Sequence, residues 1–193
     1  MRATRFLILA EVAAFFVLLF SSNLAFSYLG FSASGLIQGQ FWTPLTSIFV
    51  HVDIFHLAIN MFFLYIFGIA LEEKIGPKKT MAIFFGAGVV TLLVGIPFYS
   101  PETRIVGSSI AVSALVGAAV ILTPNRKSPL LLFVPLGLVA MIYLIFNAFM
   151  LLFDQTGGVA YQSHIIGFFV GVLFGLGWRK GTVVSSEPKR QEP

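Results

Sequence analysis

The sequence contains no cysteine and few charged residues. None of its 193 residues is cysteine, and only 10% are Asp, Glu, Lys or Arg. The first absence excludes disulfides, thiol nucleophiles and cysteine-ligated metal sites. The second excludes an ordinary soluble domain, in which about 25% of residues are charged, because so few charges cannot cover a water-facing surface of this size.

Apolar residues dominate what is present. They make up 58% of the chain, give a mean hydropathy of +0.94, and occur in long uninterrupted blocks. Such blocks are typical of membrane proteins. The net charge of +4 could indicate nucleic-acid binding, but the placement of the basic residues indicates membrane orientation instead. We therefore predict an all-α, polytopic membrane helix bundle surrounded by lipid bilayer, with no nucleic-acid partner.

Six apolar blocks predict six membrane spans. A full crossing needs about 20 apolar residues. The fourth block has 14 residues before Thr123, or about 21 Å of helix, so this helix is expected to begin or end inside the hydrocarbon. The first block superficially resembles a signal peptide but is interpreted as a retained span. The predicted spans are 6–26, 54–71, 80–99, 109–122, 130–153 and 161–178.

The basic residues predict the orientation of these spans. Of the twelve Lys and Arg residues, only Arg104 falls on the opposite side from the rest, and cytoplasmic loops carry an excess of Lys and Arg. Both termini are therefore expected in the cytoplasm. We expect a membrane domain over 1–180 and a disordered cytoplasmic tail over 181–193. The simple architecture favours a prokaryotic cell membrane.

Polar residues inside a bilayer are costly and usually functional, and the first such cluster opens the second span. It contains His51, His56 and Asn60. His56 and Asn60 are four residues apart, so they share one helix face, and both can donate hydrogen bonds. These two side chains are candidate donors at the outer end of the span.

The second cluster lies where an outer loop enters the short fourth span. It contains Gly107, Ser108 and Ser109, with Ser113 one turn further on. A serine at a helix N-terminus meets free backbone N–H groups and the positive end of the helix dipole, which stabilise negative charge beside its Oγ. Gly107 permits a tight backbone at this entry. Ser109 is the candidate nucleophile, with Ser108 and Ser113 as competitors.

The third cluster lies in the sixth span. Gly167, Gly171 and Gly175 recur every four residues and form a smooth stripe that another helix can approach closely. His164 lies one turn before Gly167 on this stripe, so its ring is expected to point into that contact. A serine at a helix start, a histidine on a partner helix and donors on a third helix suit acyl transfer.

With these residues the sequence resembles the rhomboid family of intramembrane serine proteases over about residues 1–178. The matching pieces are His51-x4-His56-x3-Asn60, Gly68-x3-Glu72-x3-Gly76, Gly107-x-Ser109 and His164-x2-Gly167-x3-Gly171. The resemblance implies Ser109 as nucleophile, His164 as general base, and an oxyanion site from His56, Asn60 and the Ser109 backbone N–H. It also implies a supporting role for His51, no metal or cofactor, and transmembrane proteins as substrates.

The sequence departs from the family at two positions beside the nucleophile. The family usually has Gly after the serine, where this chain has Ile110, and often an aromatic four residues after it, where this chain has Ser113. The first difference predicts a more crowded site or an altered entry turn, and the second a less firmly held His164 ring. Phe146, Phe149 and Phe153 make the fifth span a candidate lateral gate.

Several alternatives stay open. Asp154, the one acidic residue near the outer end of the sixth span, could be a third member of the catalytic group, although a Ser-His dyad is expected. His51 fits a structural role better than a catalytic one, and Glu11, inside the first span, receives no role. A non-catalytic rhomboid-like protein that binds transmembrane clients is the alternative function, followed by a small transporter or channel. The sequence specifies neither substrate nor oligomeric state.

Overall fold

The computed structural model describes residues 2–154 and 158–183. These residues form helices joined by short turns and, apart from two isolated β-bridges, contain no strand. The α-helices are α1 (Arg2–Leu18), α2 (Ser22–Leu29), α3 (Ala33–Ile37), α4 (Thr43–Thr46), α5 (Ile54–Phe63), α6 (Ile69–Ile75), α7 (Pro77–Met81), α8 (Gly88–Gly95), α9 (Ser109–Leu122), α10 (Leu136–Phe153) and α11 (Tyr161–Val183).

The predicted all-α membrane bundle is confirmed. π-Helical turns at Leu64–Gly68 and Ala82–Ala87 join α5 to α6 and α7 to α8, so that each pair forms one continuous rod. Among the described residues four helices are long and apolar enough to cross a membrane: Ile54–Ile75, Pro77–Phe98, Leu136–Phe153 and Tyr161–Arg179. α1, with 17 residues, and α9, with 14, are shorter.

Several of the predicted spans differ from the helices of the structure in their bounds or continuity. The first is interrupted after Leu18 by a 3-10 turn, and a separate helix, α2, follows. The fifth begins at Leu136 and not near residue 130, because the preceding segment folds back on itself through the bridge between Lys127 and Pro135. α11 continues to Val183, past the expected start of the tail, and residues 184–193 lie outside the described part of the chain.

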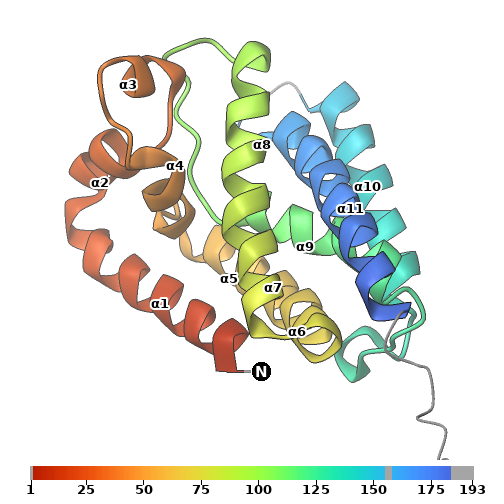
Figure 1. Cartoon of the computed structure of the whole chain (residues 1–193). Helices are drawn as coiled ribbons and strands as arrows, with labels where there is room; N and C mark the ends of the chain where they lie inside the picture. The colour runs from red at the N-terminus through yellow and green to blue at the C-terminus, as the bar shows by residue number, and fades with distance from the viewer. Residues whose placement is uncertain (1, 155–157, 184–193) are drawn as a thin grey trace, which may run out of the picture.

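Helix α9 lies in the centre of the bundle, where the larger hydrophobic core forms around it (Figure 1). Of its 14 residues, 11 are buried. The segment between α8 and α9 runs from the end of the bundle at which α3 lies, here called the rim, down into the bundle before α9 begins (Figure 1). The bridge between Phe31 and Ile105 holds this segment against the loop after α2. The short helix therefore starts well below the rim, as its length predicted.

The glycine stripe of α11 packs against α9, which confirms the predicted close approach. A Cβ added at Gly171 would lie 1.9 Å from the Ala114 carbonyl oxygen, and one at Gly117 would lie 1.9 Å from the Phe168 carbonyl oxygen. Only glycine lets the two backbones come this close. The stripe thereby fixes the position of His164, in the first turn of α11, relative to the start of α9.

Helix α1 is attached to the bundle through Glu72. Its carboxylate accepts hydrogen bonds from the backbone N–H groups of Ala3 and Thr4, at 3.2 and 2.9 Å, and from the Thr4 hydroxyl at 2.7 Å. A carboxylate at a helix N-terminus also meets the positive end of the dipole. Gly68 permits this approach, because a Cβ there would lie 2.8 Å from the Thr4 methyl group.

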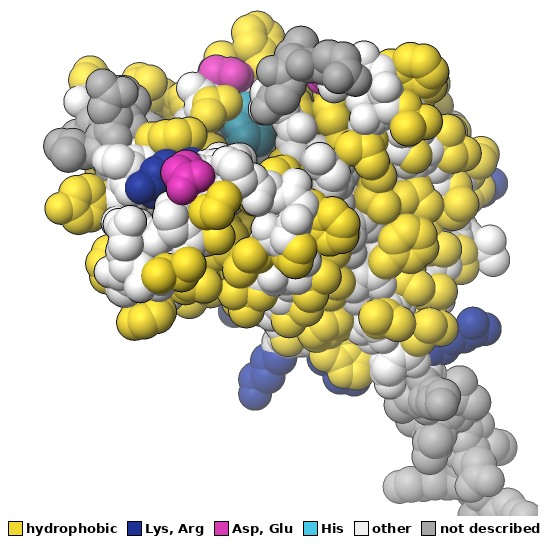
Figure 2. Space-filling model, turned by 90° about the horizontal axis from the view of Figure 1, so that it is seen from above, with side chains coloured by type: hydrophobic (Ala, Val, Ile, Leu, Met, Phe, Trp, Pro, Cys, Tyr) yellow, Lys and Arg dark blue, Asp and Glu magenta, His cyan; other side chains and the backbone are white. Residues whose placement is uncertain are grey.

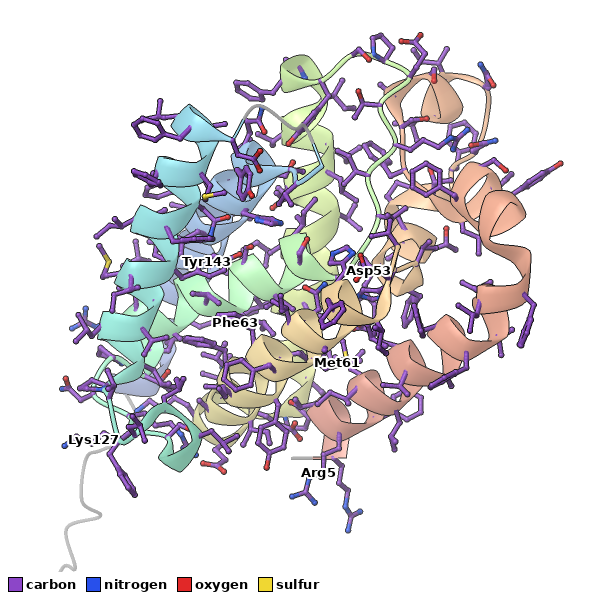
Figure 3. The ribbon with its side chains drawn as sticks, turned by 180° about the vertical axis from the view of Figure 1, so that it is seen from behind. Arg5, Asp53, Met61, Phe63, Lys127 and Tyr143 are labelled. Carbon is purple, nitrogen blue, oxygen red and sulfur yellow. The ribbon has the colours of Figure 1, made fainter. Side chains whose placement is uncertain are left out.

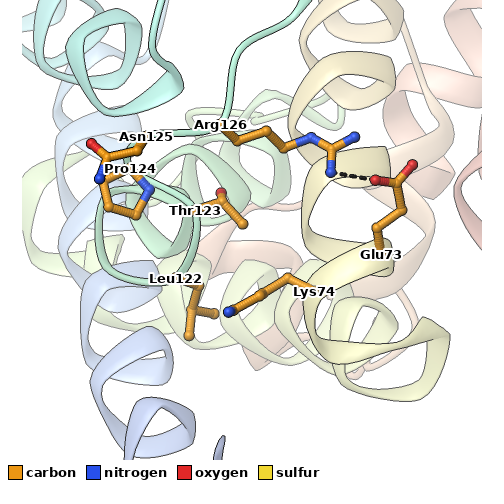
Figure 4. Close-up of a pocket in the computed structure, with 7 residues that line it drawn as sticks. All are labelled: Glu73, Lys74, Leu122, Thr123, Pro124, Asn125 and Arg126. Atoms are coloured by element: carbon orange, nitrogen blue, oxygen red, sulfur yellow. Dashed lines mark ion pairs between the residues drawn. The ribbon is translucent and has the colours of Figure 1, made fainter.

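Basic side chains mark one end of the bundle. Arg5 and Lys127 both lie at the lower end in Figure 3, and a pocket of about 490 Å³ opens beside the C-terminal end of α9 (Figure 4). Glu73, Lys74 and residues 122–126 line this pocket, and Arg126 forms an ion pair with Glu73. The start of α9 lies about 21 Å away, so Ser109 is remote from this basic end.

Candidate active site

The structure brings Ser109 and His164 into direct contact. The Ser109 Oγ lies 2.9 Å from Nε2 of His164, within hydrogen-bond reach for a nucleophile and its base. Ser109 is half-buried and His164 is 9% exposed. Two residues that are 55 positions apart in sequence thus meet because the α9–α11 interface aligns the two helix starts.

Gly107 shapes the backbone that leads into α9. It has a φ of +101°, a conformation that side-chain-bearing residues rarely adopt, and its N–H donates to the Ser47 carbonyl at 2.9 Å. A Cβ here would lie 2.5 Å from Cε1 and 2.7 Å from Nε2 of the His56 ring. The glycine therefore allows the His56 ring to lie against the backbone near Ser109.

His56 and Asn60 lie on α5, which packs beside α9. The N-cap residue Asp53 accepts a hydrogen bond from the His56 backbone N–H at 2.7 Å, and this cap fixes the helix start that carries the His56 ring. Asn60 is 3% exposed, and its Nδ2 donates one hydrogen to the His56 carbonyl at 2.9 Å. An amide nitrogen has two donors, so one remains for another acceptor.

Asn147 is a site residue that the sequence analysis missed. It lies on α10, is 2% exposed, and places its Oδ1 2.8 Å from Nδ1 of His164. Its Nδ2 donates to the Tyr143 carbonyl at 2.9 Å. An asparagine within the predicted fifth span was a visible signal, since a buried amide in apolar surroundings needs partners.

Tyr143 supplies the aromatic ring that Ser113 lacks. Its ring lies 6.5 Å from that of His164, at an interplanar angle of 35°, and packs edge-on against Phe63 of α5. Its hydroxyl lies 2.5 Å from the Ser113 Oγ. The aromatic neighbour of the His164 ring thus comes from α10 and not from α9.

Contrary to the expectation from the sequence, the Ile110 side chain does not crowd the site. Its side chain is 3% exposed and packs in a small separate core with Phe31, Leu92 and Ile105. The Ile110 carbonyl faces α11, where a Cβ on Gly167 would lie 2.8 Å from its oxygen. The Ile110 side chain therefore packs away from His164 and stabilises this second core.

The competing serines bond elsewhere. Ser113 donates to the Ser109 carbonyl at 2.7 Å. Ser108 is fully buried and donates to the Glu11 carboxylate of α1 at 2.6 Å, with His51 Nε2 3.4 Å from its Oγ. Burial and the nearby His56 lower the pKa of His51 to about 4. Glu11 is thus hydrogen-bonded to the residue immediately before Ser109.

Asp154 does not occupy the position beside His164. Its Oδ2 accepts a hydrogen bond from the Tyr161 hydroxyl at 2.9 Å, whereas Asn147 contacts His164 Nδ1. The Tyr161 ring is edge-on to the His164 ring, at 6.2 Å and 88°. Tyr161 therefore packs edge-on against the histidine and links the start of α11 to the end of α10.

The site opens toward the rim opposite the basic end. Figure 2, viewed from above, shows histidine atoms inside a hollow that is bordered by hydrophobic, acidic and other side chains. Within the described residues, no group of three or more His, Asp or Glu side chains is placed to hold a metal ion. The chemistry that such a site can offer is acyl transfer to a serine oxygen, whose proton passes to the neighbouring imidazole.

The chain is similar in sequence to several rhomboid proteins. The chain is 32% identical over 79 residues to Rhomboid-like protease 2 of Toxoplasma gondii, covering 41% of this chain and 28% of that protein. It is 28% identical over 143 residues to Rhomboid protease GluP of Bacillus subtilis (strain 168), covering 73% and 27%. It is also 34% identical over 79 residues to Inactive RHOMBOID-like protein 8 of Arabidopsis thaliana, covering 41% and 22%.

The chain thus spans less than a third of the length of each of these relatives. The profile of the family described as "Rhomboid domain" matches residues 38–180. This match covers the four helices that are long enough to cross a membrane, together with Ser109 and His164, and the chain is a multi-pass membrane protein that belongs to the rhomboid family.

Proposed function

We propose that this chain is an intramembrane serine endopeptidase that cleaves transmembrane segments. The observation that supports this best is the 2.9 Å contact between Ser109 Oγ and His164 Nε2, at the start of a helix that begins below the rim. Family membership and the protease names of relatives support the same reaction. The basic residues at the opposite end support cytoplasmic termini and an outward-facing site in a cell membrane.

The reaction follows from the geometry. The Ser109 Oγ attacks the scissile carbonyl carbon, and its proton passes to His164 Nε2 as the new C–O bond forms. The backbone N–H groups at the start of α9, with His56 and Asn60 as further donors, stabilise the oxyanion. The C–N bond then breaks, and the imidazolium gives its proton to the leaving amine. Water, deprotonated by His164, hydrolyses the acyl-enzyme.

A cleavage assay with purified protein in proteoliposomes tests this proposal. Wild-type protein should cleave a model transmembrane substrate, and Ser109→Ala should abolish cleavage. Ser108→Ala is the matched control, because it removes the neighbouring hydroxyl and leaves the Ser109–His164 contact in place. Undiminished cleavage by Ser109→Ala, with Ser108→Ala inactive, would show that the wrong serine has been assigned.

The similarity to a relative named as inactive supports one alternative, a non-catalytic protein that binds transmembrane clients. A fluorophosphonate probe separates the two functions, because it reacts with an activated serine whether or not the right substrate is supplied. Labelling of the wild type that is lost in both Ser109→Ala and His164→Ala supports the protease. Client binding without labelling supports the alternative.

A further inference from the structure

Asn147 is the one polar side chain among the buried residues of α10. Most side chains of this helix face outward, and only Leu136, Ala140 and Asn147 are buried. An amide taken out of water costs free energy unless its hydrogen-bonding groups have partners. Both polar atoms of the Asn147 side chain have one, and one of those partners is the histidine that contacts the candidate nucleophile.

The hydrogen-bond network fixes the orientation of the Asn147 amide. Oxygen and nitrogen of an amide are assigned from their neighbours, and the neighbour here is the Tyr143 carbonyl, which can only accept. The amide nitrogen must therefore face that carbonyl, at 2.9 Å, which leaves Oδ1 facing His164 Nδ1 at 2.8 Å. Amide oxygen accepts only.

This orientation assigns the proton on the His164 ring. Because Asn147 Oδ1 can only accept, Nδ1 of His164 carries the hydrogen, and in the neutral ring Nε2 is then the free acceptor. Nε2 is the atom that lies 2.9 Å from Ser109 Oγ. The base is thus held in the tautomer that can take a proton from the serine, and the same oxygen stabilises the imidazolium that forms.

We propose that Asn147 is the positioning residue for His164. It completes a Ser109–His164–Asn147 arrangement whose members come from the three helices α9, α11 and α10. Tyr143 lies one turn earlier on α10. Its backbone carbonyl accepts a hydrogen bond from the Asn147 amide, and its side chain contacts Ser113 and Phe63. The role in catalysis rests on the proposed protease function, but the tautomer does not.

Nitrogen-15 NMR of histidine-labelled protein reads the tautomer directly. The chain has three histidines, and His164→Gln identifies the resonances of His164 by their loss. In the wild type we expect protonated Nδ1 and unprotonated Nε2. In Asn147→Leu, which is of similar size and lacks the acceptor, we expect a mixture of tautomers, whereas Asn147→Asp, which keeps an acceptor oxygen, should restore the Nδ1–H form.

The rate of fluorophosphonate labelling at Ser109 provides the second measurement. Asn147→Leu should lower it about 10- to 100-fold, the effect of losing one hydrogen bond to a group that becomes charged, and Asn147→Asp should recover most of it. Ile145→Leu, at an outward-facing position of α10 that is 64% exposed, is the control and should match the wild type.

Two outcomes would overturn the proposal. The first is an Nε2–H tautomer of His164 in the wild type, a result that stands even if the Asn147 variants fail to fold. The second is a folded Asn147→Leu protein with wild-type tautomer and labelling rate. If the Nδ1–H tautomer is found but Ser109 is never labelled or needed for cleavage, the protease function fails while the positioning of the ring by Asn147 holds.

Discussion

The close contact between α9 and α11 makes Gly171→Ala a severe test of the structure. The added Cβ would lie 1.9 Å from the oxygen, 2.6 Å from the carbon and 2.7 Å from the Cα of Ala114. All three atoms are backbone, so no side chain can rotate away. Ordinary contacts begin at 3.4 Å, and the two helices must therefore separate by about 1.5 Å at this level because packed interiors hold no spare volume.

The free energy of this change is the difference between two opposing effects. Replacing a helical glycine by alanine stabilises the helix by about 1 kcal/mol. Overpacking a filled interface typically costs about 1–3 kcal/mol, and a collision with rigid backbone belongs at the upper end of that range. We therefore expect Gly171→Ala to lose about 2 kcal/mol of folding free energy and to lower the thermal midpoint in detergent.

The activity should fall further than the stability. Gly171 lies two helical turns, about 10 Å, beyond His164 on α11, so a separation at Gly171 also moves the His164 ring away from Ser109. Misplacing a catalytic group by about 1 Å can cost about 100-fold in rate. Cleavage and fluorophosphonate labelling should both fall at least 10-fold at a temperature where the variant remains folded.

Gly177→Ala is the matched control for this experiment. It makes the same substitution on the same helix, but a Cβ at Gly177 would meet no atom within 4 Å. We expect wild-type activity and equal or slightly higher thermal stability. If Gly171→Ala behaves like Gly177→Ala, the close packing of α11 on α9 is wrong, and with it the explanation of how His164 reaches Ser109.

The parts of the site that could be predicted are those with a local pattern. The length of the fourth apolar block placed the start of α9 at Ser109, and the four-residue glycine repeat predicted both a close helix partner and an inward-facing His164. These patterns work because a helix translates sequence spacing into a common face. The identity of the partner helix was not in the pattern and came from the fold.

The parts that could not be predicted depend on contacts between distant segments. Asn147 was visible as a polar residue in an apolar span, but nothing in the sequence links it to His164. The ring of Tyr143 replaces an aromatic that the family often carries on another helix, and such an exchange has no local signature. Ile110 was misjudged for the same reason, since its direction depends on how the entry turn at Gly107 rotates the helix start.

Two further substitutions test the supports of the site. Glu72→Ala removes three hydrogen bonds that hold the start of α1. Each bond to a charged acceptor contributes about 1.5 kcal/mol or more, so we expect a large loss of thermal stability. An unchanged thermal midpoint would contradict this attachment of α1. Gly107→Ala should abolish labelling of Ser109, because the added Cβ meets the His56 ring at 2.5 Å and the φ of +101° disfavours alanine. Gly39→Ala is the control for an alanine at positive φ elsewhere in the fold, since Gly39 has a similar φ of +92° but would meet no atom within 4 Å. Equal loss of activity in both variants would assign the effect to general destabilisation, whereas loss confined to Gly107→Ala would show that the conformation of the turn into α9 matters for the reaction of the serine.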